Sequence, residues 1–125
     1  MRVISCCLTE KGAKELELAA KSNGPGAVQC VLMDVTKEDS VAKALVEIKK
    51  LVGADGGVHA LINNAGVLRG ELFDTMEMKE WDFQLAVNVV GAARVGKALL
   101  PLIVKARGRI INVASVAGIF GTEGT

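Results

Sequence analysis

The sequence contains no tyrosine and few other aromatic residues, with one tryptophan and three phenylalanines among 125 residues. Because large rings are scarce, a hydrophobic core has to be built from Val, Leu, Ile and Ala. Half of the residues are hydrophobic, whereas only two are proline. This composition is typical of a globular domain and excludes a disordered chain.

Strong charge and metal-ligand clusters are missing too. The formal net charge is +1 and no run of basic residues occurs, so nothing in the charge favours a nucleic-acid partner. His59 is the only histidine, and no other His or Cys stands at ligand spacing from it, which predicts a structural role for His59 and no metal site. Cys6, Cys7 and Cys30 are odd in number and two are adjacent, which favours reduced, buried thiols over disulfides.

Long hydrophobic runs are absent as well. The first apolar run, 3–8, is too short for a signal peptide and is followed at once by Glu10 and Lys11. The longest run, Ala98–Val104, contains Pro101 and is far below the length that spans a membrane. From these runs we expect a soluble chain.

What the sequence does contain is a regular alternation of strand and helix patterns. Strands are predicted over 3–8, 27–33, 58–63 and 109–113, and helices over 10–21, from a capping box at Thr36 and Asp39 to about 51, and from about 76 to 105 with a kink at Pro101. Alternating strands and helices are typical of a parallel sheet with helical crossovers. The sequence therefore predicts one doubly wound α/β unit over residues 1–125.

The chain is organised around the third of these strands, which ends in Asn63-Asn64-Ala65-Gly66. Two amides and a glycine are unusual at the end of a buried strand, because the amides need partners and glycine indicates close backbone approach. Ligands of open α/β sheets bind beyond the carboxyl ends of the strands. The tetrapeptide is therefore a candidate ligand site, with a merely polar turn as the alternative.

Three further polar residues occupy informative places. Asn88 lies in a helix that is apolar nearly all round, which predicts a buried amide that must be hydrogen-bonded, either to a ligand or within the fold. Ser115 ends the last strand and could hold a substrate oxygen or bond its own backbone in a turn. Asp34 ends the second strand and could accept a hydrogen bond from a base or ribose, or begin the next helix.

Taken together, Asp34-Val35, Asn63-Asn64-Ala65-Gly66, Asn88 and Ser115 resemble the classical short-chain dehydrogenases/reductases in order and spacing. The resemblance covers essentially the whole chain. Finer similarity to the retinol and hydroxysteroid dehydrogenase branch, to which the mitochondrial 3-hydroxybutyrate dehydrogenases are close, is carried by 7–13, 34–37, 99–102 and 106–109.

The resemblance implies a Rossmann-like fold and a role for each motif. Asp34 and Val35 would flank the adenine, and Asn63, Asn64, Ala65 and Gly66 would line the adenosine side and brace the central strand. Asn88 would hold a water in a proton relay. Ser115 would hydrogen-bond the reacting carbonyl or alcohol oxygen next to the nicotinamide.

Two parts of the family pattern have no counterpart in the sequence. The glycine-rich turn that meets the pyrophosphate would precede Met1, and the Tyr-x-x-x-Lys pair should follow Ser115 by about a dozen residues, yet the sequence has no tyrosine. By the family order the chain would hold strands 2–5 and leave the middle of the sheet open. We therefore expect the isolated chain to fold poorly, to bind no dinucleotide and to be inactive.

The resemblance further implies the partners. It implies NAD or NADP as cofactor with a slight preference for NAD, a lipophilic alcohol or ketone such as a retinoid or steroid, and a complete form that is membrane-associated, homo-oligomeric and located in the endoplasmic reticulum or the mitochondrion. The alternatives are a truncated, non-catalytic Rossmann protein with a binding role or none, and, less favoured, a nucleotide-sugar epimerase.

Overall fold

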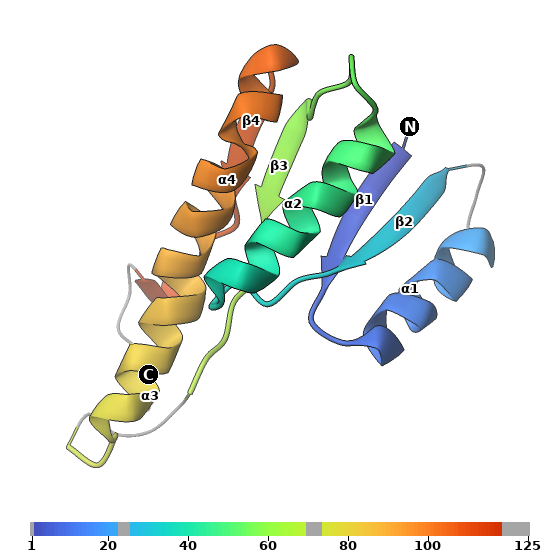
Figure 1. The fold of residues 1–125 in the computed structure, drawn as a ribbon. Helices are drawn as coiled ribbons and strands as arrows, with labels where there is room; N and C mark the ends of the chain where they lie inside the picture. The colour runs from blue at the N-terminus through green and yellow to red at the C-terminus, as the bar shows by residue number, and fades with distance from the viewer. Residues whose placement is uncertain (1, 23–25, 70–73, 119–125) are drawn as a thin grey trace.

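The structure, a computed structural model, describes residues 2–22, 26–69 and 74–118. Helices and strands alternate along these residues, as the sequence predicts (Figure 1). The elements are β1 (Arg2–Cys7), α1 (Glu10–Ser22), β2 (Ala27–Leu32), α2 (Glu38–Val52), β3 (Ala60–Asn63), α3 (Met78–Leu85), the π-helical segment η1 (Ala86–Gly91), α4 (Ala92–Lys105), β4 (Arg109–Asn112) and the 3-10 turn η2 (Val116–Gly118).

The strands form two separate parallel pairs, β1 with β2 and β3 with β4. Figure 1 shows β1 and β3 running in the same direction, so the carboxyl ends of both pairs lie at the same end of the molecule. A doubly wound sheet has the strand order 3-2-1-4-5-6. The two pairs match 3-2 and 4-5 of this order, so the division between β1 and β3 falls where the middle strand was expected to be missing.

The two pairs are covered differently by helices. In β2 successive side chains face opposite sides: the Cys30 thiol donates to the Ala13 carbonyl of α1 at 3.5 Å, whereas Val31 is buried in the core against α2. Among the described residues, α4 covers one face of β3 and β4, and Ile62 on β3 remains 59% exposed. The prediction of a fully buried strand there is wrong, because it assumed a second helical layer.

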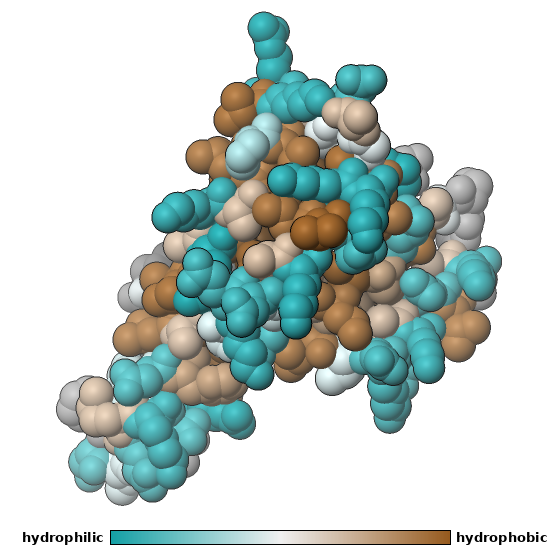
Figure 2. All heavy atoms as spheres, viewed as in Figure 1, coloured by the Kyte–Doolittle hydropathy of each residue, from teal (hydrophilic) through white to brown (hydrophobic). Residues whose placement is uncertain are grey.

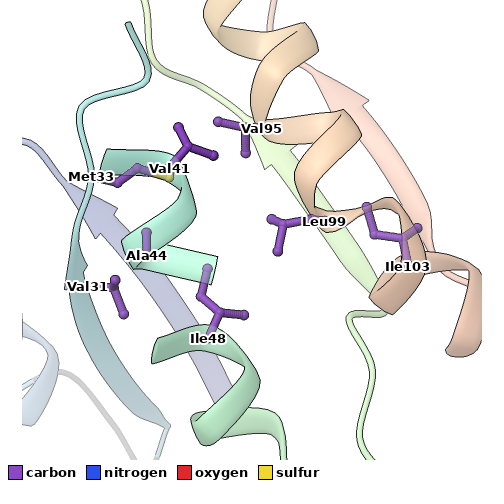
Figure 3. Packing of buried hydrophobic residues seen from close by; sticks show 8 residues of the cluster. All are labelled: Val31, Met33, Val41, Ala44, Ile48, Val95, Leu99 and Ile103. Atoms are coloured by element: carbon purple, nitrogen blue, oxygen red, sulfur yellow. The ribbon is translucent and has the colours of Figure 1, made fainter. Parts of the chain in front are cut away.

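The core lies between α2 and α4 (Figure 3). Helical spacing brings the apolar residues of each helix onto one face, and the two faces meet over β2. The eight buried members of this cluster are Val31, Met33, Val41, Ala44, Ile48, Val95, Leu99 and Ile103. Packing of α2 against α4 therefore joins the two strand pairs, which share no ladder.

The first two helices begin differently. Thr9 caps α1, since its Oγ1 accepts the Gly12 N–H at 3.1 Å. The prediction of a capping box at Thr36 and Asp39 is wrong: α2 begins at Glu38, and Lys37 is the N-cap residue, whose side chain makes no capping hydrogen bond. The hydroxyl of Thr36 turns back to the preceding strand end instead, where it donates to Asp34.

The cysteines are free, as expected, but not all are buried. Cys6 is exposed, which corrects the prediction of three buried thiols, whereas Cys7 and Cys30 are half-buried. Burial, followed by a hydrogen bond with Cys7, raises the pKa of the Cys30 thiol to about 11. Cys30 therefore stays protonated at neutral pH.

The segments α3, η1 and α4 form one continuous helix, Met78–Lys105. Its 28 residues are long and apolar enough to cross a membrane by length and composition, which the run Ala98–Val104 alone did not indicate. Core helices share this composition, and Val95 and Leu99 of this helix pack in the core. Apolar residues also reach the surface along the side that α4 occupies (Figure 2), among them Val104. The kink at Pro101 stays a prediction.

Gly91 gives a sharp test of how closely this helix approaches the β2–α2 connection. A Cβ at Gly91 would lie 2.7 Å from Val35 Cγ2, closer than real Cβ contacts. We expect Gly91→Ala to lower the free energy of unfolding by about 1–3 kcal/mol, measured by urea denaturation of the complete protein.

Gly96 in the same helix is the matched control. A Cβ there would meet only Ile110 Cδ1, at 3.9 Å. Gly96→Ala should therefore raise stability by about 0.5–1 kcal/mol through helix propensity. Equal effects of the two substitutions would contradict the close approach at Gly91.

Candidate functional site

The site is built at the carboxyl ends of β3 and β4. The Asn63 amide donates to Asn112 Oδ1 at 2.9 Å, and the Asn63 carbonyl accepts the Val113 N–H at 2.9 Å. These bonds hold together two strand ends that are 49 residues apart in the chain. Asn63 therefore braces the central strand, and Asn112, which the sequence analysis did not single out, is its partner.

The loop after Asn63 is attached to η1 through Asn88. The Val67 N–H donates to Asn88 Oδ1 at 2.8 Å, and the Asn88 amide donates back to the Val67 carbonyl at 2.9 Å. The side-chain amide of Asn88 thus bonds both backbone groups of Val67, as the backbone of a neighbouring strand would. Gly66 lies directly beside it, since a Cβ there would be 3.6 Å from Asn88 Oδ1.

Asn88 is exposed, so the prediction of a buried amide is wrong. The helix is apolar around this position, but among the described residues only part of its circumference is covered, and Val89 remains 58% exposed. The requirement for a partner is nevertheless met, within the fold, by Val67.

More contacts join the same helix to the next residues of the loop. The Arg69 N–H donates to Gln84 Oε1 at 3.1 Å, Arg69 Nε lies 3.3 Å from Glu80 Oε2, and the guanidinium stands 5.3 Å from the centre of the Phe83 ring. Glu80 is half-buried and paired with Arg69.

Asp34 lies two residues after the end of β2 and accepts hydrogen bonds from the residues that follow it. Its Oδ1 accepts from the Thr36 hydroxyl at 2.6 Å and from the Thr36 N–H at 3.0 Å, and its Oδ2 lies 3.4 Å from Lys37 Nζ. The Thr36 hydroxyl, then its backbone N–H and Lys37, lower the pKa of Asp34 against the opposing effect of burial. The carboxylate therefore stays charged, with three of its roughly four acceptor positions in use.

Val35 is held from the far side of the core. The Arg94 guanidinium of α4 donates to the Val35 carbonyl at 2.6 Å, and the Val35 side chain fills the space above Gly91. The Val35 N–H donates to no described residue. Sequence reasoning missed Arg94, because a lone arginine in a helix carries no signal of its target.

Ser115 adopts the turn arrangement that the sequence left open as an alternative. Its Oγ accepts the Ala117 N–H at 3.2 Å and its carbonyl accepts the Gly118 N–H at 3.1 Å, which forms η2. The residue is exposed, and the hydroxyl proton remains available to an external acceptor.

The structure thus brings Asn63, Gly66 and Asn88 into one neighbourhood. Ser115 follows β4 at the same sheet edge, whereas Asp34 and Val35 end the other strand pair. The site is an open edge: the groove of about 700 Å³ lies elsewhere, between α1, β2 and α2.

His59 and the acidic and cysteine side chains of the described residues form no metal site. His59 is exposed, and its carbonyl accepts the Arg109 N–H at 2.9 Å. Within residues 2–22, 26–69 and 74–118, no three His, Cys, Asp or Glu side chains are grouped to hold a metal ion.

The lowered pKa of Asp34 predicts a pH dependence of stability. The ionised carboxylate stabilises the folded state above its ordinary pKa of 3.8, and this contribution is lost as the pH falls through the lowered folded value. We expect Asp34→Asn to lower stability at pH 6 and the difference from the parent protein to shrink below pH 4, followed by urea denaturation at each pH. Asp55→Asn, at an exposed site, is the control; a difference that does not change with pH would contradict the mechanism.

Comparison with known proteins identifies the family of the chain. The model of the short chain dehydrogenase family matches residues 1–125. The chain is 44% identical over 126 residues to 17-beta-hydroxysteroid dehydrogenase type 6 of Rattus norvegicus and 42% identical over 120 residues to retinol dehydrogenase 16 of Mus musculus. Each alignment covers 94% of the chain but 36% of the relative, so the chain spans about a third of the length of these proteins.

Solved structures show the same fold. The chain superposes on a gluconate 5-dehydrogenase from Burkholderia cenocepacia, crystallised with NADP and tartrate, with a TM-score of 0.81 at 28% identity over 97% of this chain and 46% of that one. Because the family model covers every residue, the chain belongs to the short-chain dehydrogenase family, in the branch of the retinol and hydroxysteroid dehydrogenases.

Proposed function

We propose that the complete protein carrying this chain is an NAD(P)-dependent oxidoreductase that moves a hydride between the dinucleotide and the CH–OH or C=O group of a lipophilic molecule. The observation that carries the proposal is the placement of the polar motifs. Asp34, Asn63 and Ser115 lie at the carboxyl ends of parallel strands, where α/β sheets bind ligands.

The residues at the end of β2 fit an adenine ring. The Val35 N–H is an open donor among the described residues, and the Asp34 carboxylate has an acceptor position left. Adenine offers an acceptor nitrogen beside an amino donor, which complements this pair. We assign the adenine to Asp34 and Val35, and the adenosine side to Asn64, Ala65 and Gly66.

The dinucleotide, when bound, supplies the hydride donor or acceptor. The Ser115 hydroxyl donates to the substrate oxygen while its own oxygen is held by the Ala117 N–H. The Asn88 side chain bonds Val67 through its oxygen and one N–H, so a relay water would bond to the second N–H of the amide. No tyrosine occurs in the sequence, so the phenol of the family's general acid/base would come from elsewhere in the complete protein.

The names of the relatives support the substrate class. Hydroxysteroid and retinol dehydrogenases are named for lipophilic alcohols, and we propose a steroid or retinoid alcohol as substrate. NAD as the preferred dinucleotide, a homo-oligomeric and membrane-associated complete form, and an endoplasmic reticulum or mitochondrial location belong to the same proposal.

Ser115→Ala in the complete protein tests the proposed reaction. Loss of one donor to the reacting oxygen should lower kcat/KM by about 10²–10³-fold, with the dinucleotide Kd within about twofold of the parent value. The assay follows NADH or NADPH absorbance with steroid and retinoid alcohols. Ser5→Ala on β1 is the control and should leave both constants unchanged; an active Ser115→Ala protein would overturn the assignment.

The 125-residue chain by itself tests the non-catalytic alternative. Because β1 and β3 share no ladder, we expect no cooperative melting and, by isothermal titration, no dinucleotide binding with a Kd below about 1 mM. Because the sequence has no tyrosine, we also expect no dehydrogenase activity. A cooperative transition with micromolar binding would contradict this expectation. A complete cellular product of 125 residues, seen by intact mass, would favour the non-catalytic alternative.

A further inference from the structure

A stripe of polar side chains on the long helix faces the loop that follows the candidate site. Glu80, Gln84 and Asn88 follow one another at intervals of four residues. Residues four apart are neighbours on a helix surface. All three contact the loop segment Val67–Arg69, so they form a clasp between helix and loop.

The clasp holds the loop mainly by its backbone. Asn88 binds both the N–H and the carbonyl of Val67, and Gln84 accepts the N–H of Arg69. The opposite end of Gln84 is turned to Met76, with its Nε2 3.7 Å from Met76 Sδ. The Gln84 side chain is half-buried, and hydrogen bonds to Arg69 and Met76 hold both ends of its amide.

The side chain of Arg69 adds the outer part of the clasp. It pairs with Glu80 at 3.3 Å and lies over the Phe83 ring at 5.3 Å. Both partners are on α3, with Glu80 one turn before Gln84 and Phe83 directly before it. The contacts between helix and loop therefore extend over more than two turns of the helix. A β-turn in the loop would need only one hydrogen bond.

The loop residues under the clasp continue directly from those assigned to the dinucleotide. Gly66 precedes Val67, and a Cβ at Gly66 would lie 3.6 Å from Asn88 Oδ1. The path of Asn64–Gly66 is fixed at one end by β3, through the Asn63–Asn112 bond, and at the other by the clasp. A loop released at Arg69 would keep the Asn88–Val67 bonds but lose the part of the second anchor that Gln84 supplies.

We propose that Gln84 is a positioning residue for dinucleotide binding, acting through the backbone of Arg69 and Val67 on Gly66. This inference rests on the proposed function, because it assumes that Asn64–Gly66 lines the dinucleotide. Gln84 does not touch the reacting atoms. Gln84 sets the position of the loop backbone, so its removal should weaken binding of the dinucleotide and leave the rate of the chemical step unchanged.

The test uses the complete protein with Gln84→Ala, Gln84→Glu and, as matched control, Gln29→Ala on β2, which takes no part in the clasp. Gln84→Ala should raise the dinucleotide KM about three- to tenfold, the size expected for one lost hydrogen bond. The kcat and the alcohol KM should stay within about twofold. Gln84→Glu keeps the acceptor oxygen for the Arg69 N–H and should restore the dinucleotide KM to within about twofold of the parent.

A second readout follows the contact itself. The Arg69 amide should exchange with deuterium faster in Gln84→Ala than in the parent, and at the parental rate in Gln84→Glu and Gln29→Ala. This measurement separates a released loop from a protein that is merely less stable, in which exchange would rise throughout.

The outcomes distinguish the two proposals. An active parent with an unchanged dinucleotide KM in Gln84→Ala, or with the same rise in Gln29→Ala, overturns the positioning role and leaves the proposed function standing. A parent without dinucleotide-dependent activity overturns the proposed function, and with it the positioning role. A rise in dinucleotide KM that Gln84→Glu reverses supports the inference.

Discussion

The packing of α2 against α4 is the interaction on which the rest of the structure depends. No ladder joins β1 to β3, so the side chains packed between these helices, together with the Arg94–Val35 hydrogen bond, hold the two strand pairs together. Val41 and Ile48 of α2 belong to one cluster with Leu99 of α4, and Val31 extends this cluster onto β2 (Figure 3). Because this contact sets the relative position of the pairs, it also sets the distance between the end of β2 and the ends of β3 and β4.

The long helix serves both the core and the site. One face places Val95 and Leu99 in the core, while another places Gln84 and Asn88 against the loop after β3. The π-helical segment lies between these two regions and carries Asn88. Such segments are rare and occur mostly at functional sites, where they alter the direction in which side chains project. Because the same helix is packed in the core and bonded to the loop, its packing determines the position of the loop.

Periodicity was enough to predict the order of the helices and strands. Apolar spacing located the helices, and the expectation that the amide at Asn63 needs a partner is met by Asn112. The predictions that failed concern burial. Ile62 and Asn88 were expected inside because their segments are apolar, but a residue is buried only when another element covers it, and local pattern does not say which elements do.

The sequence by itself determined the order of the elements, the family, and the polar residues at the strand ends, because spacing along the chain records the faces of helices and strands. Only the tertiary structure decided what those polar groups bind. Thr36 bonds Asp34 where a helix cap was expected, Asn88 bonds Val67, and Arg94 reaches Val35 across 59 residues. Hydrogen-bond partners distant in sequence depend on the packing of whole helices, which no local pattern contains.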